Sequence, residues 1–201
     1  MSQAIDFYFD FSSPYGYLGS QRIDAIGEKH NCAVNWRPYL MGAVFKQLGT
    51  SPLVSQPVKG PYSRHDLMRS ARLYGIDFNI PDPFPVHTVA ACRAYYWVQD
   101  SAGDERAKQL AQALYRGYFI DNCNVGDAEV VVKTAAELGL DGEAVAAALQ
   151  DDAIKARLRT EVDAALEKGV FGAPFFIYGD ERFWGCDRID HLDKWLETGG
   201  W

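Results

Sequence analysis

Two short segments at opposite ends of the sequence constrain the fold more than any other feature. The first, residues 10–15 (Asp-Phe-Ser-Ser-Pro-Tyr), follows an alternating apolar run of Ile5, Phe7 and Phe9. That pattern predicts a strand leading directly into a helix. The second, residues 171–176 (Phe-Gly-Ala-Pro-Phe-Phe), places a proline just before an apolar strand. Ser13 is therefore expected at a helix N-terminus, where unpaired backbone N–H groups stabilise an anion such as a thiolate.

The predicted order of elements places a long helical block between two α/β segments. Strands at 4–9 and 33–37 flank a helix at 14–30, and residues 38–86 are rich in Pro, Gly and Ser with one helix at 62–74. Further helices are expected at 87–100, 104–120, 127–138, 141–150 and 151–168. Strands at 175–178 and 182–184 and a helix at 187–197 follow. This order predicts one α/β domain (1–40 and 168–201) interrupted by an all-helical insertion (41–167).

Composition narrows the class of protein. With 201 residues, of which 48% are hydrophobic, the chain can bury a full core. No apolar run reaches the roughly 18 residues that span a bilayer, and no secretory signal is visible, so we expect no membrane partner and a cytoplasmic location. The net charge of −7 argues against nucleic acid as a partner and favours small molecules.

The cysteines and histidines indicate neither a redox pair nor a metal site. No two of the four cysteines form Cys-x-x-Cys, so reduced thiols are expected. The four histidines make no metal-binding spacing with one another or with the cysteines, so no metal is expected. The sequence also shows no histidine–carboxylate arrangement near Ser13 that would make its hydroxyl a nucleophile.

Four motifs in sequence order resemble one family. Residues 9–18 (Phe-Asp-Phe-Ser-Ser-Pro-Tyr-Gly-Tyr-Leu) are similar to the N-terminal motif of the kappa-class glutathione transferases and 2-hydroxychromene-2-carboxylate isomerases, usually Asp-x-x-Ser-Pro-x-Ser-Tyr-Leu. Residues 59–62 (Lys-Gly-Pro-Tyr) followed by Asp66 and Arg69, residues 172–175, and residues 184–188 (Trp-Gly-Cys-Asp-Arg) also match. The resemblance covers essentially the whole chain and implies a thioredoxin-like fold with a helical insertion.

The resemblance also implies an activity. It implies glutathione as cofactor, a homodimer, and isomerisation of a small aromatic carboxylate. The substrate would be 2-hydroxychromene-2-carboxylate and the product trans-o-hydroxybenzylidenepyruvate, in bacterial degradation of naphthalene and related aromatics. Redox relatives carry cysteines at the places of Ser13 and Gly16, so dithiol chemistry is not expected here. Ser13 would instead stabilise and position a thiolate supplied by glutathione.

The same resemblance assigns the remaining site residues. The bond before Pro174 would be cis, and the backbone of Ala173 would pair with the cysteinyl part of glutathione. Cys186 and Asp187 would bind the γ-glutamyl end, and Lys59 the glycyl carboxylate. Three positions depart from the family. Cys186 stands where Ser or Asn is common, Thr50 follows Gly49 where the family has Asn after Gly, and Gly16 stands where Ser is usual.

Simpler explanations stay open for each feature. Ser13 and Pro14 can be a helix cap alone, Pro174 an edge-strand proline, and Lys59 a solvated loop residue. A basic stretch on an acidic protein can receive an anionic substrate or be a solvated helix face; it comprises Arg64, His65, Arg69 and Arg72. The alternative functions are a kappa-type transferase acting on another electrophile, a non-catalytic thiol- or peptide-binding module, and, least favoured, a disulfide oxidoreductase.

Overall fold

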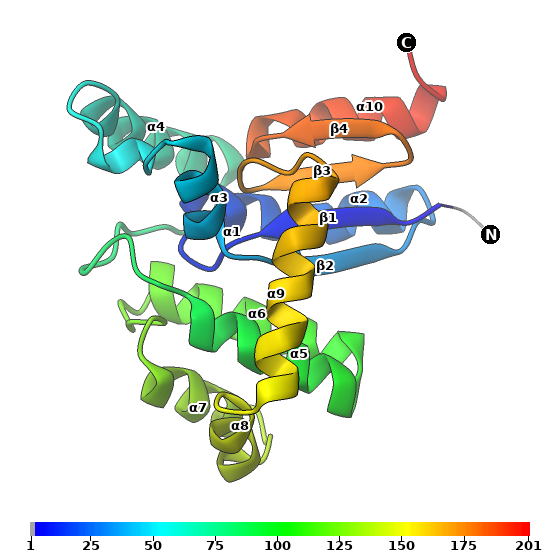
Figure 1. The fold of residues 1–201 in the computed structure, drawn as a ribbon. Coiled ribbons are helices and arrows are strands. Elements are labelled where there is room, and N and C mark those ends of the chain that lie inside the picture. Colours follow the sequence, from blue (N-terminus) through cyan, green and yellow to red (C-terminus); the bar gives the residue numbers. More distant parts are fainter. Residues whose placement is uncertain (1–2) are drawn as a thin grey trace.

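The computed structural model, which describes residues 3–201, is built on one four-stranded mixed sheet (Figure 1). The strand order is β2-β1-β3-β4, where β1 is Ile5–Phe9, β2 Val34–Pro38, β3 Phe175–Tyr178 and β4 Glu181–Trp184. β1 and β2 are parallel, and the other two pairs are antiparallel. Tyr8 lies opposite Phe175, which lies opposite Trp184. The end of β1, the start of β3 and the end of β4 therefore meet at one edge of the sheet, which brings the two sequence motifs together.

Helices surround this sheet on both faces and beyond β2. On one face lie α1 (Pro14–Ser20), α2 (Ile23–Lys29) and α10 (Ile189–Thr198), and α9 (Asp152–Glu167) crosses the other (Figure 1). The pair α5 (Val89–Ala102) and α6 (Asp104–Phe119) packs on the β2 side, where the hydroxyls of Tyr95 and Tyr96 donate to the carbonyls of Trp36 and Pro38. Beyond this pair lie α7 (Ala128–Glu137) and α8 (Gly142–Ala148). The predicted fold class, a thioredoxin-like α/β fold with helices between its two halves, is confirmed.

The segment after β2 differs most from the sequence prediction. A helix that the sequence did not predict, α3 (Met41–Leu48), follows β2 directly and precedes the short 3-10 helix η1 (Leu53–Ser55). No side chain of its own caps α3; the N–H of Met41 donates instead to the carboxylate of Asp10, 2.8 Å away. Because this cap comes from another part of the chain, no local sequence pattern predicts it.

Helix α4 (Lys59–Tyr74) begins three residues earlier than predicted. Gly60 donates to the carbonyl of Gln56, and Pro61 stands in the first turn, where its missing N–H costs nothing. The expectation that Lys59 lies in a loop is therefore wrong, because Lys59 is the first residue of α4.

The two helices that flank the site are also divided. The predicted helix 14–30 is two helices, because the Ser20 hydroxyl hydrogen-bonds the Tyr17 carbonyl and the chain breaks at Gln21 and Arg22. The last predicted helix starts as a 3-10 turn, η2 (Cys186–Arg188), before α10.

Aromatic side chains join the sheet to the helical block. Phe7 stacks on Phe9 and Phe176, with ring centroids 5.0 and 5.3 Å apart. Phe9 in turn contacts Tyr95 of α5 and Tyr115 of α6. The core is continuous across the proposed boundary, and the division into residues 1–40 with 168–201 and residues 41–167 stays a prediction. Among the helices of residues 3–201, none combines the length and the apolar character needed to cross a bilayer.

Truncating one leucine of α6 tests this core. Leu110 is fully buried, so Leu110→Ala is expected to lower the free energy of unfolding by about 2–5 kcal/mol through lost burial and a new cavity. Leu73→Ala is the matched control, because Leu73 is 76% exposed and its truncation should change stability by less than about 0.5 kcal/mol. Urea unfolding followed by circular dichroism measures both, and equal losses would contradict the described packing.

Candidate functional site

Ser13 begins α1, as the sequence predicted. Its side-chain oxygen accepts a hydrogen bond from the N–H of Gly16 at 3.0 Å, and Pro14 occupies the first helical position. Its own N–H donates to the carbonyl of Asp10 at 2.8 Å, and the side chain is almost fully buried. Ser13 is thus fixed by its own helix and by Asp10, the residue that directly follows β1.

The two sequence motifs meet at the hydroxyl of Ser13. This hydroxyl donates to the carbonyl of Ala173 at 2.9 Å, across 160 residues of sequence. The Ala173–Pro174 peptide bond is cis, and the Pro174 ring lies against Gly19 of α1, where a side chain would come within 3.1 Å of it. Since a serine hydroxyl has one proton, the Ser13 donor is committed to Ala173 in this arrangement.

The segment 185–187 follows the same edge. The N–H of Gly185 donates to the carbonyl of Pro174 at 3.0 Å. Gly185 has a φ of +109°, and a Cβ there would lie 2.5 Å from an Asp187 carboxylate oxygen, so only glycine fits. The Asp187 side chain is 63% exposed and pairs with Arg188 at 3.1 Å. Its carboxylate is therefore available to a ligand beside Pro174.

Cys186, expected to help bind the γ-glutamyl end of glutathione, has a buried side chain. Its side chain is almost fully buried, and burial raises the pKa of its thiol to about 12, with the nearby Asp187 carboxylate acting in the same direction. The thiol therefore stays neutral near pH 7 and is shielded from solvent. A contact from this residue would come from its backbone.

Asp10 is a site residue that the sequence analysis did not single out. One carboxylate oxygen accepts the N–H of Ser12 at 2.8 Å and the hydroxyl of Thr88 at 3.0 Å; the other accepts the N–H of Met41. Burial raises the pKa of this carboxyl, while these three donors act in the opposite direction. Its position inside the first motif, directly after β1, was the signal that could have found it.

Tyr115 of α6 closes the space beneath the first turn of α1. Its hydroxyl donates to the carbonyl of Asp10 at 3.0 Å. A Cβ at Gly16 would lie 2.8 Å from that hydroxyl. The absence of a side chain at position 16, one of the three departures from the family motif, therefore matches the tyrosine hydroxyl that fills the space.

Residues 86–88 are hydrogen-bonded to the loop that follows β1. The N–H of Val86 donates to the side-chain oxygen of Ser12 at 3.0 Å, and Thr88 donates to Asp10. Between these two anchors lies His87, which is exposed and whose charge helps to lower the pKa of Asp10. The hydrogen bonds of the Ser13 side chain go to Ala173 and Gly16, so the expectation that no histidine–carboxylate pair activates its hydroxyl stays a prediction.

Helix α4 reaches the site through Tyr15, the neighbour of Pro14. The Tyr15 hydroxyl donates to Asp66 at 2.7 Å, and Asp66 also pairs with Arg69. Burial opposes the shift, but these two hydrogen bonds lower the pKa of the Asp66 carboxyl. Lys59 is exposed and lies seven residues before Asp66, about 10 Å along the helix axis. The structure thus places Ser13 in contact with Ala173, whereas Lys59 lies further away, at the start of α4.

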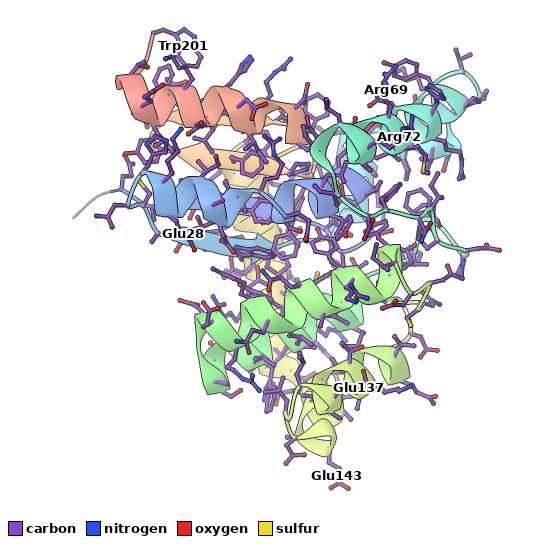
Figure 2. All side chains as sticks on the ribbon, turned by 180° about the vertical axis from the view of Figure 1, so that it is seen from behind. Glu28, Arg69, Arg72, Glu137, Glu143 and Trp201 are labelled. Carbon is purple, nitrogen blue, oxygen red and sulfur yellow. The ribbon has the colours of Figure 1, made fainter. Side chains whose placement is uncertain are left out.

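The basic stretch lies on the same helix. Figure 2 labels Arg69 and Arg72 on α4, at the opposite side of the view from Trp201. Arg69 is held by Asp66 and by the hydroxyl of Tyr62 at 3.2 Å. These contacts within α4 are those of a solvated helix face, and a role in receiving an anion remains a prediction.

Two cavities lie elsewhere. One of about 280 Å³ is found at the far end of the sheet; its lining includes Asp6, Asn35, Lys168 and Arg182. The other, of about 80 Å³, lies between β2 and the α5–α6 pair and is lined in part by Trp36, Tyr95 and Lys108. None of the candidate residues lines either cavity. Within residues 3–201, no group of three or more His, Cys, Asp or Glu side chains is placed to hold a metal ion.

The burial of Cys186 predicts its reactivity. With a thiol pKa of about 12, only about one molecule in 10⁴ carries the thiolate at pH 8, against roughly a quarter for an ordinary cysteine. Iodoacetamide at pH 8, followed by peptide mass spectrometry, should modify the exposed Cys123 first and Cys186 only after unfolding in urea. Modification of Cys186 in the native protein as fast as that of Cys123 would contradict this environment.

The sequence is similar to those of known proteins along almost its whole length. A family model described as a DSBA-like thioredoxin domain matches residues 4–197. The 2-hydroxychromene-2-carboxylate isomerase of Sphingobium xenophagum is 28% identical over 198 residues, covering 98% of this chain and 99% of that protein. Glutathione S-transferase kappa 1 of Rattus norvegicus is 22% identical over 211 residues, covering 96% of this chain and 93% of that protein.

Solved structures lead to the same group. A structure of a 2-hydroxychromene-2-carboxylate isomerase superposes with a TM-score of 0.86 at 26% identity, covering 96% of this chain and 94% of that one. The resemblance found in the sequence motifs is thus confirmed along the chain. The protein belongs to the DSBA-like thioredoxin family, as a relative of the 2-hydroxychromene-2-carboxylate isomerases and kappa-class glutathione transferases.

Proposed function

We propose that the protein is a glutathione-dependent isomerase that converts 2-hydroxychromene-2-carboxylate to trans-o-hydroxybenzylidenepyruvate in the degradation of naphthalene-type aromatics. The hydrogen bond between the Ser13 hydroxyl and the Ala173 carbonyl carries the proposal. It sets a hydroxyl, where redox relatives have a thiol, beside a backbone edge that can receive a peptide-like ligand. The likeness to isomerases over almost the whole chain supports the reaction class.

Glutathione binding would exchange hydrogen bonds rather than create all of them anew. The cysteinyl N–H of glutathione can donate to the Ala173 carbonyl, which now accepts from Ser13. The Ser13 hydroxyl, released from Ala173, can then rotate and donate to the sulfur. One neutral hydrogen bond is thus lost and two form, of which the bond to the developing thiolate is charge-assisted and so stronger.

The remaining parts of the ligand have partners of suitable charge. The exposed Asp187 carboxylate can pair with the γ-glutamyl ammonium, and the backbone of Cys186 can bind the α-carboxylate. Lys59, exposed at the start of α4, is proposed for the glycyl carboxylate. We also propose a homodimer in the cytoplasm, where free cysteines stay reduced.

The chemistry requires reversible addition of the thiolate. Glutathione adds to the conjugated system, which turns a double bond into a single bond. Ring opening, rotation about that bond and elimination of glutathione then give the trans product. Ser13 acts by stabilising and positioning the thiolate and forms no covalent bond. A kappa-type transferase acting on another electrophile is the second candidate, because it would share the glutathione contacts and the chain is similar to a kappa-class enzyme.

The first test follows the absorbance of 2-hydroxychromene-2-carboxylate with protein dialysed free of glutathione. We expect conversion only when reduced glutathione is added. Conversion without glutathione would contradict the proposed cofactor. Glutathione binding with no conversion would reject the isomerase in favour of the transferase or a binding module.

Replacing Ser13 tests the thiolate role. Ser13→Ala should raise the pKa of bound glutathione by about one to two units, because a hydrogen bond to a charged group contributes about 1.5–3 kcal/mol. Ultraviolet titration of the thiolate near 240 nm measures this pKa. Ser20→Ala is the matched control, since Ser20 is buried in the same helix and donates to Tyr17 instead. An unchanged pKa in Ser13→Ala would remove Ser13 from the mechanism.

Replacing Asp187 tests the ligand's ammonium contact. Asp187→Asn is expected to weaken glutathione binding about 10-fold or more while changing kcat at saturating glutathione by less than about threefold. Titration calorimetry and steady-state kinetics separate the two effects. Asp180→Asn, at the exposed β3–β4 turn, is the control. A loss in kcat as large as the loss in affinity would count against the assigned contact.

A further inference from the structure

His87 is held against the loop that presents Ser13. Its two neighbours in sequence are both anchored there, Val86 through the side-chain oxygen of Ser12 and Thr88 through the carboxylate of Asp10. The imidazole itself is exposed. The residues on both sides of His87 are therefore bonded to the Asp10–Ser13 loop. These bonds fix the backbone of His87 next to that loop while its side chain stays accessible to solvent.

The charges around His87 suit a proton carrier. Asp10, in the loop after β1, lies near enough for the charge of His87 to lower the pKa of its carboxyl. The groups packed around Asp10 carry no charge near pH 7, because burial raises the pKa of Tyr39, Cys92 and Tyr115. On the turn before α7, Gly126 packs against the His87 carbonyl, and the adjacent Asp127 uses its carboxylate to cap α7. Histidine is the side chain whose ordinary charge change falls between pH 5 and 8, the range in which a proton carrier is needed.

We propose that His87 is a catalytic residue that moves the proton required for ring opening. This inference rests on the proposed isomerase function. The substrate carries a hydroxyl and the ring oxygen on the same carbon, C2. The His87 imidazole removes the proton of that hydroxyl, whose electron pair forms the C2 carbonyl. The C2–ring oxygen bond breaks with its electron pair on the ring oxygen, which takes the proton back from the imidazolium as a phenol.

This step balances without any further reactant. One proton leaves the C2 hydroxyl and one arrives at the phenol oxygen, and no electrons are gained or lost overall. Ser13 is not suited to this transfer, because in the proposed complex its single proton is donated to the thiolate. His87 adds what Ser13 lacks, a group that both accepts and donates a proton near neutral pH.

The test uses the full-length protein saturated with glutathione. His87→Asn is expected to lower kcat at pH 7 by about 100-fold or more, the usual size of a general acid–base contribution. The pH dependence of kcat assigned to the imidazole should be lost, and the pKa of bound glutathione should stay within a few tenths of a unit. His191→Asn, an exposed histidine on α10, is the matched control and should retain wild-type kinetics.

Chemical rescue separates a proton carrier from a structural residue. Because position 87 is exposed, free imidazole should raise the kcat of His87→Ala in proportion to the imidazole concentration. The kcat of the wild type should not change. Circular dichroism of both variants checks the fold. A His87→Asn enzyme within threefold of wild type, or an absence of rescue in a folded His87→Ala, would overturn the proposal.

Two further outcomes identify what has failed. If His87→Asn raises the pKa of bound glutathione and its rate recovers fully at high pH, the histidine stabilises the thiolate, and the proton transfer is rejected. If the wild-type protein binds glutathione but does not convert the substrate, the proposed function itself fails, and this role for His87 fails with it.

Discussion

The hydrogen bonds of the buried Asp10 carboxyl are the interactions on which the site depends. Its carboxylate gathers the N–H of Ser12, the N–H of Met41 and the hydroxyl of Thr88, and so ties the loop after β1 to the starts of α3 and α5. Its carbonyl accepts from Ser13 and Tyr115. A buried carboxylate is tolerated only with such donors, and each buried donor left without it would cost about 1–3 kcal/mol. One residue thus fixes four neighbouring segments around Ser13.

The site contains hydrogen bonds that stay in place and one hydrogen bond that a ligand can replace. The hydrogen bonds to Asp10 lie inside the protein and are hard to break, because breaking them would leave buried polar groups without partners. The bond from Ser13 to Ala173 joins two neutral groups, and a typical neutral bond contributes only about 1 kcal/mol net. On the proposed function, a ligand that offers an N–H to Ala173 and a sulfur to Ser13 replaces that bond while the Asp10 contacts stay in place. Binding then reorients one hydroxyl and leaves the backbone where Asp10 holds it.

Local signals predicted the parts of the fold that local interactions stabilise. The caps at Asp127 and Asp141 accept from N–H groups within their own first turns. By contrast, α3 was missed because its N-terminal N–H is satisfied by Asp10, 31 residues earlier. The site follows the same rule: family motifs linked Ser13 to Ala173, but nothing in the sequence showed that residues 86–88 bond to residues 10–12. His87 was overlooked because its position depends on those tertiary contacts.

On the proposed function, the residues at the site explain why the sulfur would come from a ligand. Position 13 carries a hydroxyl, and Cys186, the cysteine beside Pro174 in space, is buried with a pKa of about 12. Neither can supply a thiolate at neutral pH. Glutathione, with an ordinary thiol pKa of about 8.5, is a few per cent ionised at pH 7, and each unit of lowering requires about 1.4 kcal/mol. A single hydroxyl released from Ala173 can supply that amount. The scaffold that stabilises a protein thiolate in redox relatives would here stabilise the thiolate of a ligand.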